Sequence, residues 1–343
     1  MTVLVTGGGG FLGREVIELL LRRGLTVRSF SRGYYPDLEA RGVMQVRGDL
    51  ADADRVLEAC LDCDLVFHVA AKAGLWGRYE DFYSANVIGT RNVIDACRAA
   101  GITRLVYTSS PSVVFNGEDM EGVDESVPYA TRFKAAYPAT KAEAEKMVLA
   151  ANGSRLATVA LRPHLIWGPG DTHLVPGILE RGRAGRIRKL GDAPKRVDFT
   201  YVTNAAQAHL LAADRLSPGS PIAGRVYFIS NGEPVVLWDF IDRLLETAGI
   251  PPVSKSVSPR LAYNAGRVSE ILWRLLRLPG EPPMTRFLAE ELATSHWFDI
   301  EAARRDLGYK PEVSMEEGLR RLKEWLEQDS VTVRKTNQRF ETA

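Results

Sequence analysis

The sequence has few cysteines, no long apolar run and almost no net charge. Its 343 residues include 44 basic and 43 acidic residues, which leaves a formal net charge of +1 and no electrostatic basis for nucleic-acid binding. No apolar segment reaches the length of a membrane span. The first residues lack the basic stretch and cleavage site of a signal peptide. Three cysteines are typical of a reducing compartment, so we expect a cytoplasmic protein.

Two of the three cysteines, Cys60 and Cys63, form a CxxC motif, which can indicate a zinc or redox site. There is no second CxxC, and Cys97 lies far away in the sequence. The pair falls where a predicted helix passes into an apolar strand. We therefore interpret these cysteines as small residues that pack in the core, and we put forward no metal ligand.

Apolar runs alternate with helical patterns over the first half of the chain. Continuous apolar strands separated by helices indicate a parallel sheet that is covered on both faces. Right-handed crossovers then give an α/β fold with a doubly wound Rossmann sheet. The predicted strands are 3–7, 26–32, 44–50, 65–71, 104–110 and 157–163, and the predicted helices are 11–23, 53–61, 86–101 and 139–153.

In the second half of the chain the regular alternation of apolar runs and helical patterns ends. This change divides the chain into a sheet domain, a cap and a tail. We assign residues 1–170 to the Rossmann domain, and we expect strands near 196–235 to return to its sheet. Residues 171–195 and 236–328 form a smaller, mainly helical substrate-binding cap in this interpretation. Residues 329–343 show no periodicity and are predicted to be a flexible tail.

A glycine-rich loop, TGGGGFLG, lies between the first strand and the first helix. Gly7, Gly10 and Gly13 have the spacing that permits a tight turn, the approach of a pyrophosphate to the backbone, and close packing of helix on strand. The N-terminus of the helix adds free N–H groups and a positive dipole end. We therefore predict a dinucleotide site here rather than an empty turn.

The end of the next strand bears on which dinucleotide binds. NAD-binding folds usually carry Asp or Glu there, for the 2′-hydroxyl of the ribose. This chain has Phe30-Ser31-Arg32 instead. A guanidinium pairs well with a 2′-phosphate, so we predict NADP(H). The alternative is that Arg32 is only an exposed surface residue.

Tyr137 and Lys141 lie four residues apart at the start of a predicted helix and share one of its faces. The lysine ammonium and an oxidised nicotinamide are expected to lower the pKa of Tyr137. Tyr137 can then exchange a proton with a carbonyl group of the substrate. Lys141 is also placed to hold the nicotinamide ribose.

Hydroxyl side chains gather at the end of the predicted strand 104–110, at Thr108, Ser109, Ser110 and, just beyond it, Ser112. One of them can hydrogen-bond the substrate oxygen and orient it toward the tyrosine. Serines after a strand often only make turns. The order of glycine loop, serine cluster and Tyr-x-x-x-Lys nevertheless favours a catalytic site.

Taken together, the motifs TGGGGFLG, HVAA, NVIGT, YTSS, YPATK and LRPHLIWGPGD resemble those of extended short-chain dehydrogenases/reductases. The resemblance implies that Tyr137, Lys141 and Ser110 are catalytic, with Ser109 as a rival to Ser110. It also implies that His68 packs on its strand rather than binding a metal. The cofactor-binding residues that we predict are Gly7, Gly10, Phe11, Leu12, Gly13, Arg32, Asp49, Leu50, Ala70, Ala71, Thr108, Tyr137, Lys141 and Pro163.

Within that superfamily the chain resembles the 3β-hydroxysteroid dehydrogenase branch. It is more similar still to the 2-alkyl-3-oxoalkanoate reductases of bacterial long-chain olefin biosynthesis, through runs such as 67–79, 86–109 and 146–171. This resemblance implies NADPH-dependent reduction of a long-chain, lipid-like β-keto acid to a 2-alkyl-3-hydroxy acid. It also implies association with the β-lactone synthetase and the decarboxylase of that pathway. We expect a homo-oligomer.

One helical segment of the predicted cap, VSEILWRLLRL, has a broad apolar face that allows three interpretations. The face can line a channel for alkyl chains, pack on its own domain, or contact a membrane surface beside nearby arginines. The apolar residues are Val268, Ile271, Leu272, Leu275 and Leu276, near Trp273 and Trp297, and the arginines are Arg267, Arg274 and Arg277.

The sequence is also compatible with other functions. A substrate carboxylate needs a cation or a hydrogen-bond donor, for which His164, His173 and Arg188 are candidates. Oxidation of a 3β-hydroxysteroid with NAD(P)+ is the alternative reaction. A sugar-nucleotide epimerase is less favoured, because the cap offers little to clamp a diphosphate. A cofactor-sensing protein without chemistry would not need both the tyrosine and the lysine.

Overall fold

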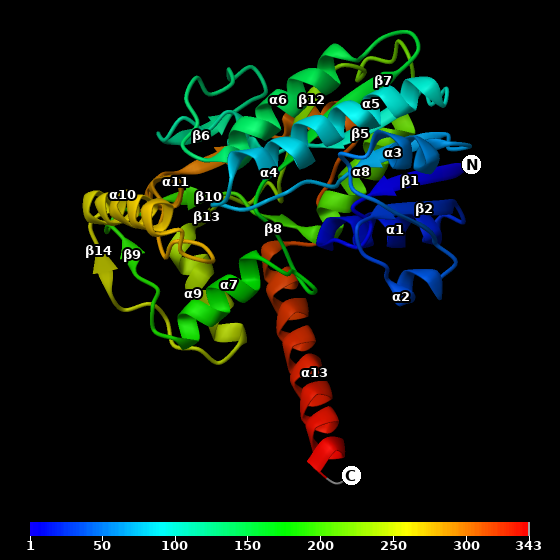
Figure 1. Cartoon of the computed structure of the whole chain (residues 1–343). Helices are drawn as coiled ribbons and strands as arrows, with labels where there is room; N and C mark the ends of the chain where they lie inside the picture. The colour runs from blue at the N-terminus through cyan, green and yellow to red at the C-terminus, as the bar shows by residue number, and fades with distance from the viewer. Residues whose placement is uncertain (342–343) are drawn as a thin grey trace.

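The computed structural model describes the backbone of residues 1–341 and the side chains of residues 1–328 (Figure 1). Its centre is a seven-stranded sheet in the order β12-β7-β5-β4-β1-β2-β3. Every neighbouring pair in it is parallel, which confirms the predicted doubly wound Rossmann sheet. The strands are β1 (Thr2–Thr6), β2 (Thr26–Ser31), β3 (Met44–Arg47), β4 (Leu65–His68), β5 (Arg104–Thr108), β7 (Ala157–Pro163) and β12 (Val226–Ile229).

Helices cover both faces of this sheet because its strands are apolar on both sides. Val3 and Val5 of β1 belong to a core that includes α1 and α8, whereas Leu4 belongs to a second core formed with α3, α5 and α6. Alternate residues of a strand point to opposite faces, which accounts for the two cores. The helices are α1 (Phe11–Arg22), α3 (Ala53–Cys60), α5 (Gly89–Ala99), α6 (Ala136–Ala150) and α8 (Val202–Arg215).

The three cysteines lie in the second core as free, buried thiols. Burial raises the pKa of Cys63 to about 11, which keeps this thiol protonated at neutral pH. The interpretation of the CxxC motif as core packing is confirmed.

Only one of the two strand segments expected near 196–235 returns to the main sheet. β12 pairs with the open edge of β7, as predicted. With that edge occupied, β10 (Arg196–Val197) joins β13 (Val235–Val236), β15 (His296–Phe298) and β6 (Met120–Val123) in a separate small sheet. β11 (Thr200–Tyr201) pairs with β8 (Ile166–Trp167) in a two-stranded sheet.

The cap gathers to one side of the main sheet, at the lower left of Figure 1. It contains α7 (Leu174–Arg183), α9 (Leu237–Thr247), α10 (Pro259–Leu276), α11 (Arg286–Ala293) and the parallel pair of β9 (Lys189–Leu190) and β14 (Ser256–Val257). α12 (Glu301–Leu307), which the sequence assigns to the cap, instead packs against β12 and α8 of the sheet domain. The remaining short helices are α2 (Pro36–Glu39), α4 (Tyr79–Tyr83), a π-helical segment at Ser84–Ile88 and a 3₁₀ turn at Pro111–Val113.

The C-terminal segment differs from the prediction. α13 (Met315–Glu341) is helical through most of the stretch expected to be an irregular tail, and residues 342–343 lie outside the described residues. Once a helix has started, each further residue adds one hydrogen bond, so α13 extends beyond the part that packs on α9. None of the helices in the described part of the chain is long and apolar enough to cross a membrane.

Candidate active site

A single large cavity of about 1800 Å³ runs from the glycine loop, past the carboxyl ends of the central strands, to the cap. In open parallel sheets, ligands bind at this edge, where the strand order reverses. The structure brings every predicted catalytic and cofactor-binding residue to the wall of this cavity. These residues are Gly7, Gly10, Phe11, Leu12, Gly13, Arg32, Asp49, Leu50, Ala70, Ala71, Thr108, Ser110, Tyr137, Lys141 and Pro163.

The glycine loop forms a tight turn that only glycine fits. Gly7 has a φ of +72°, and a Cβ built on it would lie 2.8 Å from the Cα of Ala70. A Cβ on Gly13 would lie 2.1 Å from the carbonyl oxygen of Gly7. Gly10 is the N-cap of α1, and no side chain caps this helix. The N–H groups of the first turn therefore face the cavity without an intrahelical acceptor.

A buried histidine ties the loop to the neighbouring strand. His68 of β4 has its Nδ1 2.8 Å from Thr6 Oγ1 and its Nε2 3.0 Å from Thr90 Oγ1. Thr6 Oγ1 also accepts a hydrogen bond from the Ala70 amide at 3.2 Å, which fixes Ala70 beside the glycine loop. Burial, followed by the charge of Lys141, lowers the pKa of His68 to about 3. His68 is thus a neutral packing residue, as predicted.

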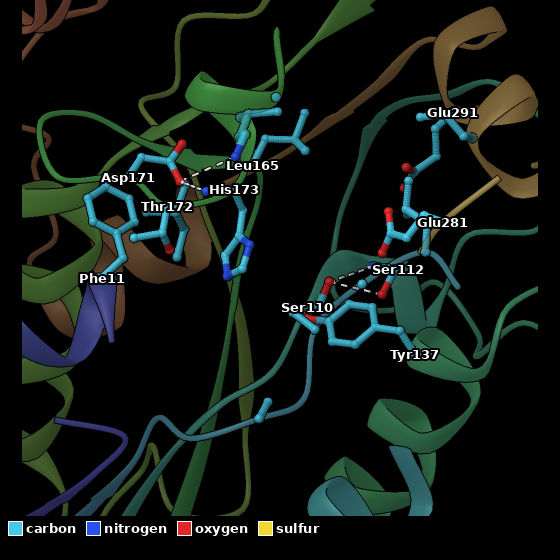
Figure 2. A pocket seen from close by; sticks show the side chains of 18 of the residues that line it. Phe11, Ser110, Ser112, Tyr137, Leu165, Asp171, Thr172, His173, Glu281 and Glu291 are labelled. Carbon is cyan, nitrogen blue, oxygen red and sulfur yellow. Dashed lines mark hydrogen bonds between the residues drawn. The ribbon is translucent and has the colours of Figure 1, made fainter. Parts of the chain in front are cut away.

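Ser110 and Tyr137 lie together on one wall of the cavity (Figure 2). Ser110 follows β5, and its Oγ is 2.9 Å from Ser112 Oγ and 3.2 Å from the Ser112 amide. Burial raises the pKa of Tyr137, and a hydrogen bond with Ser110 opposes that rise. The two hydroxyl groups are therefore close enough to act on one substrate oxygen.

Lys141 is buried one helical turn beyond Tyr137, but its ammonium points toward β5. Its Nζ donates to the carbonyl oxygen of Thr108 at 2.6 Å and lies 4.3 Å from the ring centroid of Tyr107. Burial lowers the pKa of Lys141 to about 7, and the Glu145 carboxylate opposes this shift. The expectation that Lys141 lowers the pKa of Tyr137 is wrong for the protein without cofactor, because burial raises that pKa and only the hydrogen bond with Ser110 opposes the rise.

The second serine of the cluster, Ser109, also borders the cavity, but its Oγ is buried and has no hydrogen-bond partner among the described residues. It lies beside Glu145, whose carboxylate accepts from Arg162 at 2.6 and 2.9 Å and from the Tyr129 hydroxyl at 2.6 Å. Burial opposes ionisation of Glu145, but the hydrogen bonds from Arg162 and Tyr129 lower its pKa. The hydrogen bond between Ser110 and Tyr137 favours Ser110 over Ser109 as the hydroxyl that meets the substrate.

Two residues of the site, His296 and Glu291, escape sequence reasoning because no motif marks them, and His296 contacts the candidate residue His164. His164 Nε2 lies 2.7 Å from Nδ1 of His296, which is 132 residues further along the chain. His296 Nε2 donates to the carbonyl oxygen of Glu291 at 2.8 Å. Burial lowers the pKa of both imidazoles, so both are neutral, and His296 Nδ1 must accept from His164.

Glu291 reaches the same part of the cavity from α11. Figure 2 shows its side chain and that of Glu281 on the cap side of Ser112 and Tyr137. Burial raises the pKa of Glu291 to about 8, so this carboxyl group is mainly protonated at neutral pH. A neutral carboxylic acid beside Tyr137 can donate a hydrogen bond to an anionic substrate group.

The apolar face predicted in the cap turns away from the cavity. Val268, Ile271, Leu272, Leu275 and Leu276 of α10 are all exposed. The interpretations of this face as an alkyl channel or as packing on its own domain are therefore wrong. Apolar side chains from other cap elements line the cavity instead: Leu190, Trp238, Ile241, Val257, Met284, Phe287 and Leu288.

Cations stand at the two ends of the cavity. Arg32, at the end of β2, and Arg47, at the end of β3, border a recess beside Asp49. Arg188 supplies a guanidinium to the wall on the cap side, and the other two candidates for a substrate carboxylate, His173 and the neutral His164, also line the cavity. Within residues 1–328 no group of three or more His, Cys, Asp or Glu is arranged to hold a metal ion.

Comparison with known proteins agrees with this geometry. Residues 4–260 match the 3-beta hydroxysteroid dehydrogenase/isomerase family, and the match spans the glycine loop, Ser110, Tyr137 and Lys141. The chain belongs to this family. Membership confirms the resemblance to the 3β-hydroxysteroid dehydrogenase branch of the extended short-chain dehydrogenases/reductases.

Within this family the chain is similar to proteins named 2-alkyl-3-oxoalkanoate reductase. The protein from Stenotrophomonas maltophilia is 57% identical over 94% of this chain and 98% of its own length. The protein from Shewanella oneidensis is 51% identical over 93% of this chain and 84% of its own length. Among solved structures, UDP-glucose 4-epimerase of Thermus thermophilus in complex with NAD superposes with a TM-score of 0.73 at 27% identity, over 95% of this chain and 99% of that one.

Proposed function

We propose that this protein catalyses the NADPH-dependent reduction of a 2-alkyl-3-oxoalkanoate to the 2-alkyl-3-hydroxyalkanoate, as a step of long-chain olefin biosynthesis. The observation that carries the proposal is the pairing of Ser110 with Tyr137 on the wall of the cavity. The glycine loop lies at one end of this cavity, and apolar cap residues line the other end. The 57% identity to a protein named for this reduction supports the choice of substrate.

The glycine loop fits a dinucleotide. Gly7 and Gly13 sit where any Cβ would fill the turn, and the uncapped N-terminus of α1 offers N–H groups to a pyrophosphate. Arg32 and Arg47, on neighbouring strand ends, supply two guanidinium groups for a 2′-phosphate. This charge favours NADP(H) over NAD(H).

Proton transfer is the part of the reaction assigned to the protein's own side chains. When bound, the reduced nicotinamide supplies a hydride to the carbonyl carbon. Tyr137, whose pKa is raised by burial, is a neutral phenol at physiological pH and donates its proton to the carbonyl oxygen. Ser110 hydrogen-bonds the same oxygen and orients it toward Tyr137. Lys141, held by the Thr108 carbonyl one helical turn beyond Tyr137, is the cation that we assign to stabilising the resulting phenolate.

The cap end of the cavity suits an acid with long alkyl chains. Aromatic and aliphatic side chains such as Trp238, Ile241 and Phe287 offer an apolar wall for the alkyl groups. Arg188 and the protonated carboxyl group of Glu291 are available to the substrate carboxylate. This apolar surface offers few groups that could bind a sugar diphosphate.

Steady-state assays with the purified chain test the proposal. A 2-alkyl-3-oxo acid with NADPH should be turned over much faster than a 3β-hydroxysteroid with NAD(P)+, and NADPH should be preferred to NADH. Arg32→Ala should reduce that preference about tenfold or more, because a hydrogen bond to a charged group contributes about 1.5–3 kcal/mol. Arg22→Ala, an exposed arginine on α1, serves as the control. Faster turnover of the steroid would refute the substrate assignment, and a clear NADH preference would refute the cofactor assignment.

A further inference from the structure

α10 is an amphipathic helix whose polar and small residues face inward. The Ser258 side chain caps its first turn by accepting from the Leu261 amide, and Pro259 occupies the first position. Gly266 lets the helix approach α11 closely, since a Cβ there would lie 2.7 Å from the backbone of Thr285. Glu270 is buried and pairs with Arg286 at 2.7 Å. These contacts fix which side of α10 packs on the cap.

The opposite side of α10 is apolar and exposed. Figure 1 places the helix at the outer edge of the cap, away from the main sheet. Seven of the twelve large hydrophobic side chains that are exposed among residues 1–328 lie in this one segment. Scattered exposed apolar residues are ordinary, but a contiguous group indicates an interaction surface. The group comprises Leu261, Val268, Ile271, Leu272, Leu275, Leu276 and Leu278, and Leu275 is the most exposed at 75%.

Positive charge borders this apolar face. Arg260, Arg267 and Arg274 are seven residues apart and so form one row along the flank of the helix. All three are exposed, and none has a carboxylate partner among the ion pairs of residues 1–328. The only acidic residue between 259 and 280 is Glu270, which is buried against α11.

We infer that the exposed face of α10 binds the surface of an anionic lipid bilayer. The helix has 18 residues and is about 27 Å long. An apolar face bordered by cations is the pattern of helices that lie in the plane of a membrane interface, where each basic residue gains from anionic headgroups. A second copy of this chain is a poorer occupant, because its own α10 face would bring further arginines and no exposed carboxylate.

The position of the face suits a lipid-like substrate. Leu261, Ala262 and Ala265 at the start of α10 line the cavity, so the same helix borders both the proposed lipid surface and the cavity wall. A substrate with two long alkyl chains partitions into bilayers and would enter from that side. This last step rests on the proposed function, whereas the docking surface itself does not.

Vesicle binding of the full chain tests the inference. The wild-type protein should sediment with vesicles of equal parts phosphatidylcholine and phosphatidylglycerol, bind pure phosphatidylcholine more weakly, and be released by salt. L272S/L275S should reduce partitioning to the anionic vesicles at least tenfold, and R260Q/R267Q should remove most of the preference for phosphatidylglycerol. Leu61→Ser, an exposed leucine at the end of α3, should bind like the wild type.

Circular dichroism and turnover of a short-chain, water-soluble 2-alkyl-3-oxo acid check that the variants stay folded and active. Leu272 and Leu275 do not line the cavity, so both measurements should match the wild type. Absence of vesicle binding, or equal binding by L272S/L275S, would overturn the inference while leaving the proposed function intact. A dimer that L272S/L275S dissociates, without vesicle binding, would assign the face to a second copy and overturn it as well.

Discussion

The substitution Gly13→Ala tests the glycine loop in the most quantitative way. A Cβ at this position would lie 2.1 Å from the Gly7 carbonyl oxygen, 2.8 Å from the Gly7 carbonyl carbon and 2.9 Å from the Cα of Gly8. A close non-bonded carbon–oxygen contact is about 3.3 Å or more, so the loop and α1 must separate by about 1 Å. All three obstructing atoms are backbone, which cannot rotate out of the way.

Two effects of opposite sign contribute to the stability of this variant. Alanine in place of glycine inside a helix gains about 0.8–1.0 kcal/mol from helix propensity. Overpacking in a well-packed region costs about 1–3 kcal/mol. The clash therefore costs at least about as much unfolding free energy as the higher helix propensity of alanine contributes. The clash has a larger effect on the affinity for the dinucleotide, because Gly7 and the first turn of α1 are the groups that move.

NADPH titration followed by fluorescence measures the effect on binding. We expect the dissociation constant of Gly13→Ala to rise tenfold or more, equivalent to about 1.4 kcal/mol or more. Gly153→Ala is the matched control, since no atom lies within 4 Å of a Cβ at that position. If Gly13→Ala bound NADPH as tightly as the control, the glycine loop would not be the phosphate-binding site.

Three further substitutions test the catalytic group and the buried charges. Tyr137→Phe should lower kcat about 10²–10⁴-fold while the NADPH dissociation constant stays unchanged, and unchanged turnover would refute its role as proton donor. Arg162→Met leaves the buried Glu145 carboxylate without its ion-pair partner and should cost about 3–5 kcal/mol of unfolding free energy in urea, whereas a loss below 1 kcal/mol would contradict the pairing. Burial raises the pKa of Asp198 to about 6 in the folded state, above the unfolded value near 3.9, so its contribution to stability is present below pH 4 and is lost as pH rises through 6. The unfolding free energy of Asp198→Asn should therefore rise relative to the wild type between about pH 4 and 7, and parallel pH profiles would contradict this.

Local spacing predicted the three motifs that the structure brings to the cavity wall, and the family resemblance supplied Asp49, Leu50, Ala70, Ala71 and Pro163. The glycine loop, the serine cluster and the Tyr-x-x-x-Lys motif each lie within a few residues of a strand end or a helix start, where the element itself fixes the direction of the side chains. Parallel strands then bring these ends to one edge of the sheet. Ser110 and Tyr137 come together for this reason, although they are separated in sequence.

Residues that depend on the packing of the cap could not be predicted in this way. His164 and His296 meet only because β15 joins a small sheet beside the main one, and Glu291 reaches the cavity only because α11 packs over it. Periodicity identified the apolar face of α10 but not its surroundings. Small residues such as Gly266 seat the other side of the helix on α11, and the leucines face outward.

The pKa of Tyr137 shows a further limit of sequence reasoning. The four-residue spacing to Lys141 places both residues on one helical face, which suggests that the ammonium acts on the phenol. The structure directs Lys141 Nζ to the Thr108 carbonyl, and burial sets the direction of the tyrosine shift. Spacing fixes the face that two residues share, whereas their surroundings fix their protonation.

An isotope measurement tests the central claim most directly. The purified chain is given a 2-alkyl-3-oxo acid and NADPH in which both hydrogens on the transferring carbon of the nicotinamide are deuterium, and the product is analysed by mass spectrometry. We expect a 2-alkyl-3-hydroxy acid with one deuterium on the carbinol carbon, formed at a rate that Tyr137→Phe lowers about 10²–10⁴-fold. A product without deuterium, or NADPH that remains unoxidised in the presence of this substrate, would contradict the claim.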